Sequence, residues 1–153
     1  MPPKLEISFI VNNPLWKIRL KPYKKTVKLA LETALLETKL KNKNDVFEVA
    51  VVLADNDFVQ ELNNKYRDKN QPTNVLSFPN QDNNLGDIIL AIETIENEAK
   101  EQGKTFHNHA THLLVHGFLH LLGYDHIEAK DADKMEKKEI KILSKLVIKN
   151  PYN

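Results

Sequence analysis

The chain has 153 residues, with 22 Lys and Arg against 21 Asp and Glu and a formal net charge of +1 at pH 7. This balance excludes a strongly basic body that binds nucleic acid by charge alone, and the length predicts one domain over residues 1–153. Cysteine is absent, which excludes disulfides, thiolate metal sites and thiol nucleophiles. Because the sequence shows neither an apolar leader nor a stretch of ~20 apolar residues, we expect a cytoplasmic protein with no membrane partner.

Strands and helices are expected to alternate in the first half of the chain. Alternating apolar and polar residues predict a strand over 5–11, and helical spacing of apolar residues predicts an amphipathic helix over about 24–40. A β-branched run predicts a buried strand over 47–54. Asp55 has the chemistry of an N-cap, and we expect a helix from it through Tyr66.

The second half begins with turn chemistry at 70–74 and a short strand at 75–79. A polar tip separates this strand from another at 86–92, and the two are expected to pair as a hairpin. This order favours an α+β fold, a single domain with a mixed β-sheet of about four strands packed with helices. Helices are expected over 93–102, where Gly103 follows, over 106–122 and over 131–148.

Three histidines have the spacing needed to bind one metal ion. They lie in the segment 116–126, which reads His-Gly-Phe-Leu-His-Leu-Leu-Gly-Tyr-Asp-His. His116 and His120 are four residues apart in a buried apolar helix, so they project from one face about 6 Å apart. Gly123 suits the left-handed end of a helix, after which the reversed chain can return His126. Three protein ligands leave a fourth tetrahedral position for water, as in catalytic zinc sites. Hydrogen-bonded core histidines are the ordinary alternative.

The same histidine spacing occurs in the zinc metallopeptidase motif H-E-x-x-H-x-x-G-x-x-H. In this chain Gly117 stands where that motif has its glutamate general base, so a metallopeptidase is the weaker interpretation. We expect one Zn²⁺ ion. Because imidazole also suits nickel, copper and iron, other divalent transition metals remain open.

Further candidates surround this motif in the sequence. Arg67 ends the helix before the proline-bearing turn. It is the candidate catalytic cation, because its planar guanidinium can donate hydrogen bonds to two phosphate oxygens. Asn74, Ser77 and Asp87 either bind substrate in the same cleft or satisfy backbone groups.

Four more polar residues flank the motif. His107, His109 and His112 precede it, and we interpret them as residues behind the ligands or along the cleft rather than as further ligands. Asp125 either orients a ligand imidazole or handles protons. Two lysine runs, over 21–28 and 137–145, are interpreted as solvated helix faces, with RNA-binding patches as the alternative.

Four segments, 62–67, 72–79, 85–88 and 116–126, resemble the ordered motifs of the YbeY family of bacterial metal-dependent endoribonucleases. The resemblance implies that His116, His120 and His126 hold zinc, that Arg67 matches a functionally important arginine, and that the fold is α+β around a mixed sheet. The family motif usually reads Thr-Asp-Val-Leu-Ser-Phe. This chain has Asn74 instead of the aspartate, which removes the charge and any acid role there.

Residues and resemblance together predict a single-strand-specific, zinc-dependent endoribonuclease that acts in small-subunit ribosomal RNA maturation and ribosome quality control. The expected partners are ribosomal RNA and ribosomal or ribosome-associated proteins, and the oligomeric state stays open. A noncatalytic zinc-containing ribosome-assembly factor is the main alternative function.

Overall fold

The computed structural model describes residues 3–38, 45–67 and 73–152. Its strands are β1 (Lys4–Val11), β2 (Val46–Ala54), β3 (Val75–Pro79) and β4 (Asn84–Ala91). They form one sheet in the order β1-β2-β4-β3, in which β1, β2 and β4 are parallel and the edge strand β3 is antiparallel to β4. The predicted α+β fold with a four-stranded mixed sheet is confirmed, and so is the hairpin.

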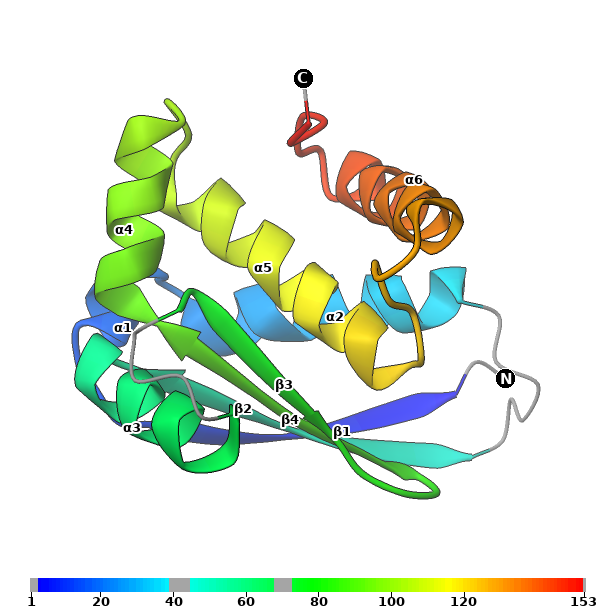
Figure 1. Ribbon diagram of the computed structural model, residues 1–153, viewed down its shortest axis with the longest axis horizontal. Helices are drawn as coiled ribbons and strands as arrows, with labels where there is room; N and C mark the ends of the chain where they lie inside the picture. Colours follow the sequence, from blue (N-terminus) through cyan, green and yellow to red (C-terminus); the bar gives the residue numbers. More distant parts are fainter. Residues whose placement is uncertain (1–2, 39–44, 68–72, 153) are drawn as a thin grey trace.

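The helices divide between the two faces of the sheet. Figure 1 shows α2 and α5 over one face, with α6 lying over both of them, whereas α3 lies on the other side of the strands. None of the helices in the described ranges combines the length and apolar character needed to cross a bilayer. The helices are α1 (Trp16–Arg19), α2 (Tyr23–Glu37), α3 (Asn56–Arg67), α4 (Ile92–Glu101), α5 (Phe106–Leu121) and α6 (Ala129–Lys145).

Most predicted elements differ from the structure by only a few residues at their ends. The single turn of α1 was not predicted, because four residues are too few to show helical periodicity. Its Trp16 is fully buried and donates a hydrogen bond from Nε1 to the Ala54 carbonyl at 2.8 Å. The predicted turn at 70–72 and the end of the predicted helix at 39–40 lie outside the described residues.

Strand alternation produces a separate apolar cluster on each face of the sheet. Successive strand residues point to opposite faces, so Leu53 and Ile88 pack with α2 and α5 in the larger cluster. Val52 and Ile89 point the other way and pack with α3 in the smaller cluster. The helix α5 therefore lies in the larger core, as the sequence predicted.

Local signals fix the ends of α5. The Thr105 hydroxyl accepts a hydrogen bond from the Asn108 N–H at 3.1 Å and caps the first turn. At the other end, Gly123 has a φ of +98° and the Tyr124 N–H donates to the Leu119 carbonyl at 3.0 Å. This arrangement is the left-handed helix end predicted from the glycine, and it turns the chain back toward α5.

The lysines over 137–145 lie on an exposed face of α6, and two of them also pair with an acid of α2. Lys141 lies 3.4 Å from a Glu37 carboxylate oxygen, and Lys145 pairs with the other oxygen. The hydrogen bond from Lys145 is the main reason that the pKa of the buried Glu37 is lowered. These contacts tie α6 to the end of α2, while the two lysine side chains stay more than half exposed, as the solvated-face interpretation predicts. Lys137 is exposed as well and pairs with the exposed Asp133 at 2.9 Å.

Gly117 lets α5 approach the sheet closely. A Cβ at this position would lie 3.0 Å from Ser77 Oγ, 3.1 Å from Ile88 Cγ2 and 3.2 Å from Val75 Cγ2. Ser77 also donates a hydrogen bond to the Gly117 carbonyl at 3.1 Å. Because position 117 has no side chain, α5 can pack directly against β3 and β4.

We predict that Gly117→Glu, which recreates the peptidase motif, lowers stability and confers no peptidase activity. The new carboxylate would be forced between α5 and the sheet, and an uncompensated buried charge costs about 3 kcal/mol or more. Thermal unfolding measures the loss, and casein digestion measures the activity. Gly117→Ala is the matched control, because one methyl group overpacks less and alanine gains helix propensity. A normally stable Gly117→Glu protein that digests casein would contradict this account.

Candidate metal centre

Three histidines converge at the end of α5 and in the loop that follows. His116, His120 and His126 each offer a ring nitrogen, and these atoms lie within 4.8 Å of one another. The Nε2 atoms of His116 and His120 are 3.1 Å apart. Two zinc–nitrogen bonds of tetrahedral geometry separate their nitrogens by about 3.3 Å, so this pair fits one ion. The exposed His126 completes a group that can bind a metal from the solvent side.

The far ring nitrogens of the two helical histidines are held by fixed acceptors. His120 Nδ1 donates to the Tyr124 carbonyl at 3.0 Å, and His116 Nδ1 donates to the Glu139 carboxylate. A proton on each Nδ1 leaves a lone pair on each Nε2, which is the tautomer that a metal needs. Burial, with His116 nearby, lowers the pKa of His120. The ring is therefore neutral at pH 7.

Glu139 of α6 is a fully buried carboxylate in contact with His116, one of the three candidate ligands. It accepts hydrogen bonds from His112 Nε2 at 3.4 Å, from His116 Nδ1 and from the Tyr152 hydroxyl. Burial acts to raise the pKa of Glu139, but these three donors outweigh it and lower the pKa to about 2. Glu139 is therefore ionised at neutral pH and orients a candidate metal ligand.

The sequence reasoning missed Glu139, although α6 contained a signal for it. The buried residues of α6 are Met135, Glu139, Ile142 and Leu143, which share one helical face. An acid in the middle of an apolar stripe must find buried partners, because an unpaired buried charge is costly. That pattern pointed to a carboxylate in the core.

A cleft of about 580 Å³ opens beside the three histidines. Arg67 lies at this cleft with an exposed side chain, and its Nη2 donates to the Ser77 carbonyl at 3.1 Å. Its guanidinium also lies 5.5 Å from the centre of the Phe78 ring. The structure thus brings most of the predicted site residues together. The cleft is lined by Arg67, Thr73, Asn74, Val75, Ser77, Pro79, His116, His120, Gly123, Tyr124, Asp125 and His126.

Asn74 lies in the wall of the cleft and forms hydrogen bonds to an acid, Glu98. Its amide Nδ2 donates to the two carboxylate oxygens of Glu98 at 3.0 and 3.3 Å. Glu98 also contacts Nε2 of the buried His109 at 2.9 Å. An aspartate at position 74 would place a second negative charge against Glu98, whereas the asparagine donates to it. The departure from the family motif is therefore compatible with this surrounding.

Asp87 is not brought into the histidine cleft. Its neighbour Ile88 packs under Gly117, so Asp87 points to the opposite face of β4, toward α3. His107 is likewise outside the cleft, since it is exposed and contacts Asn108 Oδ1 at 3.4 Å. Of the alternatives given for these two residues, the place in the cleft is therefore corrected, by strand alternation for Asp87 and by its position in the first turn of α5 for His107.

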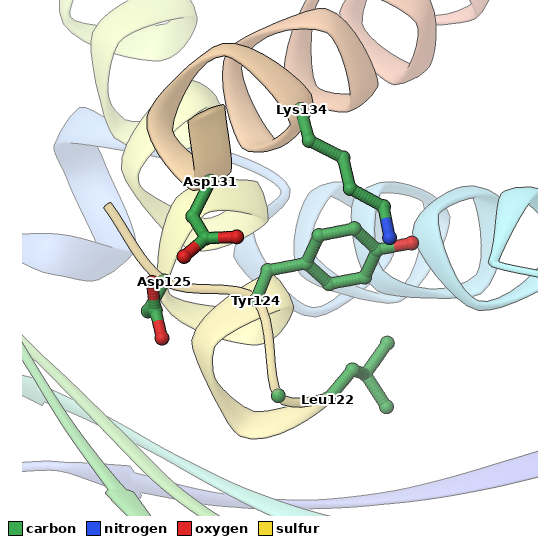
Figure 2. Close-up of a pocket in the computed structure, with 6 residues that line it drawn as sticks. Leu122, Tyr124, Asp125, Asp131 and Lys134 are labelled. Carbon is green, nitrogen blue, oxygen red and sulfur yellow. The ribbon is translucent and has the colours of Figure 1, made fainter. Parts of the chain in front are cut away.

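Asp125 lies between two hollows. Figure 2 shows the second one, of about 300 Å³, where Lys134 of α6 runs over the Tyr124 ring and Asp125 and Asp131 lie beside the loop. Asp125 Oδ1 accepts a hydrogen bond from the Ile127 N–H at 3.4 Å. Glu139 and the Tyr124 carbonyl already orient two of the histidines. Asp125 is an exposed acid that lines the cleft.

Comparisons with known proteins show which family this chain resembles. A family model described as Endoribonuclease YbeY matches residues 10–147. An Endoribonuclease YbeY from Colwellia psychrerythraea (strain 34H) is 47% identical over 137 residues, covering 86% of this chain and 88% of the relative. One from Bartonella bacilliformis is 50% identical over 113 residues, covering 69% and 72%. A solution structure from Thermotoga maritima, with 24% identity and 92% and 91% coverage, has a TM-score of 0.58 and supports the fold alone.

We predict that Glu139→Gln lowers zinc affinity by about 10- to 100-fold, because the His116 ring loses its charged partner. Competition with a chromogenic chelator measures the affinity, and thermal unfolding of the metal-free protein measures the separate effect on stability. Glu136→Gln is the matched control, since Glu136 is exposed on the same helix. Equal zinc affinities for the wild type and Glu139→Gln would refute the orienting role.

Proposed function

The chain belongs to the YbeY family of endoribonucleases, and on that premise we propose that it is a zinc-dependent endoribonuclease that cuts single-stranded RNA. We assign the activity to one hydrolase domain over residues 1–153, acting in the cytoplasm. We infer that its substrate is small-subunit ribosomal RNA, in maturation and ribosome quality control, with ribosomal or ribosome-associated proteins as partners. The convergence of three imidazoles and Arg67 on one cleft carries the proposal.

Zinc is the ion that the donor set supports best. The candidate ligands are three imidazoles, and the Nδ1 atoms of two of them are held by acceptors that fix the metal-binding tautomer. Other divalent transition metals accept the same ligands. When bound there, zinc supplies the Lewis acidity that lowers the pKa of water and offsets phosphate charge.

Arg67 is the residue that we assign to the scissile phosphate. Its bond to the Ser77 carbonyl and its place over Phe78 hold the guanidinium at the cleft. A guanidinium has five N–H donors, so others stay available for two phosphate oxygens. Ser77 Oγ and the Asn74 amide donate to other protein groups, and we therefore assign them to shaping the wall.

Asp125 is our candidate for proton transfer. It is an exposed carboxylate in the loop that carries His126, and it lines the same cleft. A general acid or base must lie within hydrogen-bond reach of the reacting oxygen or reach it through one water. Among the predicted residues, Asp125 is the acid that lines the metal cleft, which supports this assignment.

The alternatives receive less support from the site. A structural zinc in a noncatalytic assembly factor would have four protein ligands, whereas the described residues bring together a group of three beside an open cleft. A metallopeptidase needs a base at position 117, and that position packs against the sheet. The open fourth position therefore favours the hydrolase.

The decisive test compares cleavage of a single-stranded ribosomal RNA fragment by zinc-loaded wild type, chelated wild type, Arg67→Ala and His120→Ala. We expect Arg67→Ala to be about 10²- to 10³-fold slower, because it removes a group that stabilises transition-state charge. His120→Ala and the chelated protein should be inactive. Arg19→Ala is the matched control, since Arg19 is a partly exposed arginine paired with Glu96 outside the cleft.

Two results would overturn the proposal. Equal cleavage by all samples would mean that a contaminant cuts the RNA. Absence of cleavage by every zinc-bound sample would favour the assembly factor, and thermal unfolding then gives an independent reading. Structural zinc predicts that His120→Ala fails to fold, whereas our proposal predicts a folded, inactive protein.

A further inference from the structure

Another hollow, separate from the one in Figure 2, lies on the opposite face of the sheet from the metal cleft. It measures about 390 Å³, and the described residues that line it are apolar or aromatic apart from one carboxylate. The edge strand β3 separates the two, because Ser77 lines the metal cleft and its neighbour Phe78 lines this hollow. The lining residues of this hollow, here called the α3 hollow, are Val52, Phe58, Leu62, Tyr66, Phe78, Asp87 and Ile89.

Two aromatic rings and two cations mark the rim of the α3 hollow. Tyr66 is 60% exposed, and its ring centre lies 5.7 Å from that of Phe78 with the planes at 66°. Lys65 Nζ lies 5.3 Å from the Tyr66 ring centre, and the Arg67 guanidinium lies 5.5 Å from that of Phe78. Phe78 is half-buried, so Tyr66 is the exposed ring of this pair. Accessible rings with cations beside them are the features that proteins use to stack bases and pair phosphates of single strands.

Arg67 connects the α3 hollow with the metal cleft. It lines the cleft, donates to the Ser77 carbonyl of β3 and lies over the Phe78 ring of the hollow. A chain that places one phosphate at Arg67 on the cleft side therefore reaches the hollow by crossing the edge of β3. The positive charges of Lys65 and Arg67 complement a phosphate backbone along that path.

Among the described residues, Asp87 is the one carboxylate that lines the α3 hollow. The strand register pairs it with Phe78, so both side chains lie together on one face of the sheet. An exposed carboxylate accepts hydrogen bonds and repels carbonyl oxygens. It therefore favours the amino group of cytosine over the carbonyl that uracil has at the same ring position.

We propose that the α3 hollow binds a nucleobase of the single-stranded RNA whose scissile phosphate lies in the metal cleft. Tyr66 and Phe78 stack the base, and Asp87 accepts a hydrogen bond from its amino group. Lys65 and Arg67 pair with the phosphates that cross β3. The proposal rests on the proposed nuclease function and adds to it a preference for an amino-bearing base, cytosine over uracil, near the cut.

The test measures binding of fluorescein-labelled oligocytidine and oligouridine, made cleavage-resistant by 2′-O-methyl and phosphorothioate groups, to the zinc-loaded protein by anisotropy. We expect tighter binding of oligocytidine. Tyr66→Ala should weaken it by about 5- to 150-fold, the loss of one stacked base, whereas Tyr66→Phe keeps the ring and the affinity. Asp87→Asn should abolish the preference for cytidine.

Leu29→Ala is the matched control, because Leu29 is 56% exposed on α2, outside both sites. Thermal unfolding checks each variant, and Tyr66→Leu replaces Tyr66→Ala if the alanine protein melts below the assay temperature. Wild-type affinity in the folded variant without the ring would overturn the proposal. Persistence of the cytidine preference in Asp87→Asn would overturn the assignment of that carboxylate.

Cleavage of the ribosomal RNA fragment by the same preparations separates this proposal from the function on which it rests. If the wild type binds oligocytidine through Tyr66 but never cleaves RNA, the nuclease proposal fails and the base site stands. If the wild type cleaves and Tyr66→Ala binds and cleaves equally well, the nuclease stands and the base site fails.

Discussion

The contact of α5 with the β3–β4 hairpin at Gly117 determines where the rest of the site lies. Because position 117 has no side chain, the helix rests on Ser77, Val75 and Ile88. The same helix carries His116 and His120, which therefore face the cleft beside the edge strand. A helix displaced by even one larger side chain would separate these histidines from the strand that anchors Arg67. Packing in the core thus sets the geometry of the surface chemistry.

The buried carboxylate of Glu139 links the candidate metal centre to the C-terminal part of the chain. Glu139 is ionised in the core because His112, His116 and Tyr152 all donate to it. Removing a buried partner costs more than removing an exposed one. The packing of α6, the position of the segment that holds Tyr152 and the orientation of a candidate metal ligand are therefore linked through one carboxylate.

Features set by local sequence were predictable, and features set by tertiary contacts were not. The strands, α5 and the His116–His120 spacing follow from periodicity, and the reversal at Gly123 follows from its backbone freedom. Glu139 is 23 residues from His116, so periodicity showed its burial but not its partner. The alternative that placed Asp87 in the metal cleft was wrong, and alternation with the buried Ile88 already indicated the opposite face.

The most direct test of the account is the coordination of zinc in the loaded wild type, measured by X-ray absorption at the zinc edge together with the stoichiometry of binding. The account predicts one ion per chain with three imidazole nitrogens and one non-protein oxygen at about 2.0–2.1 Å. His126→Ala should then show two imidazoles. A site closed by four protein ligands, or a zinc spectrum without imidazole, would contradict the central claim that the three histidines form an open metal centre.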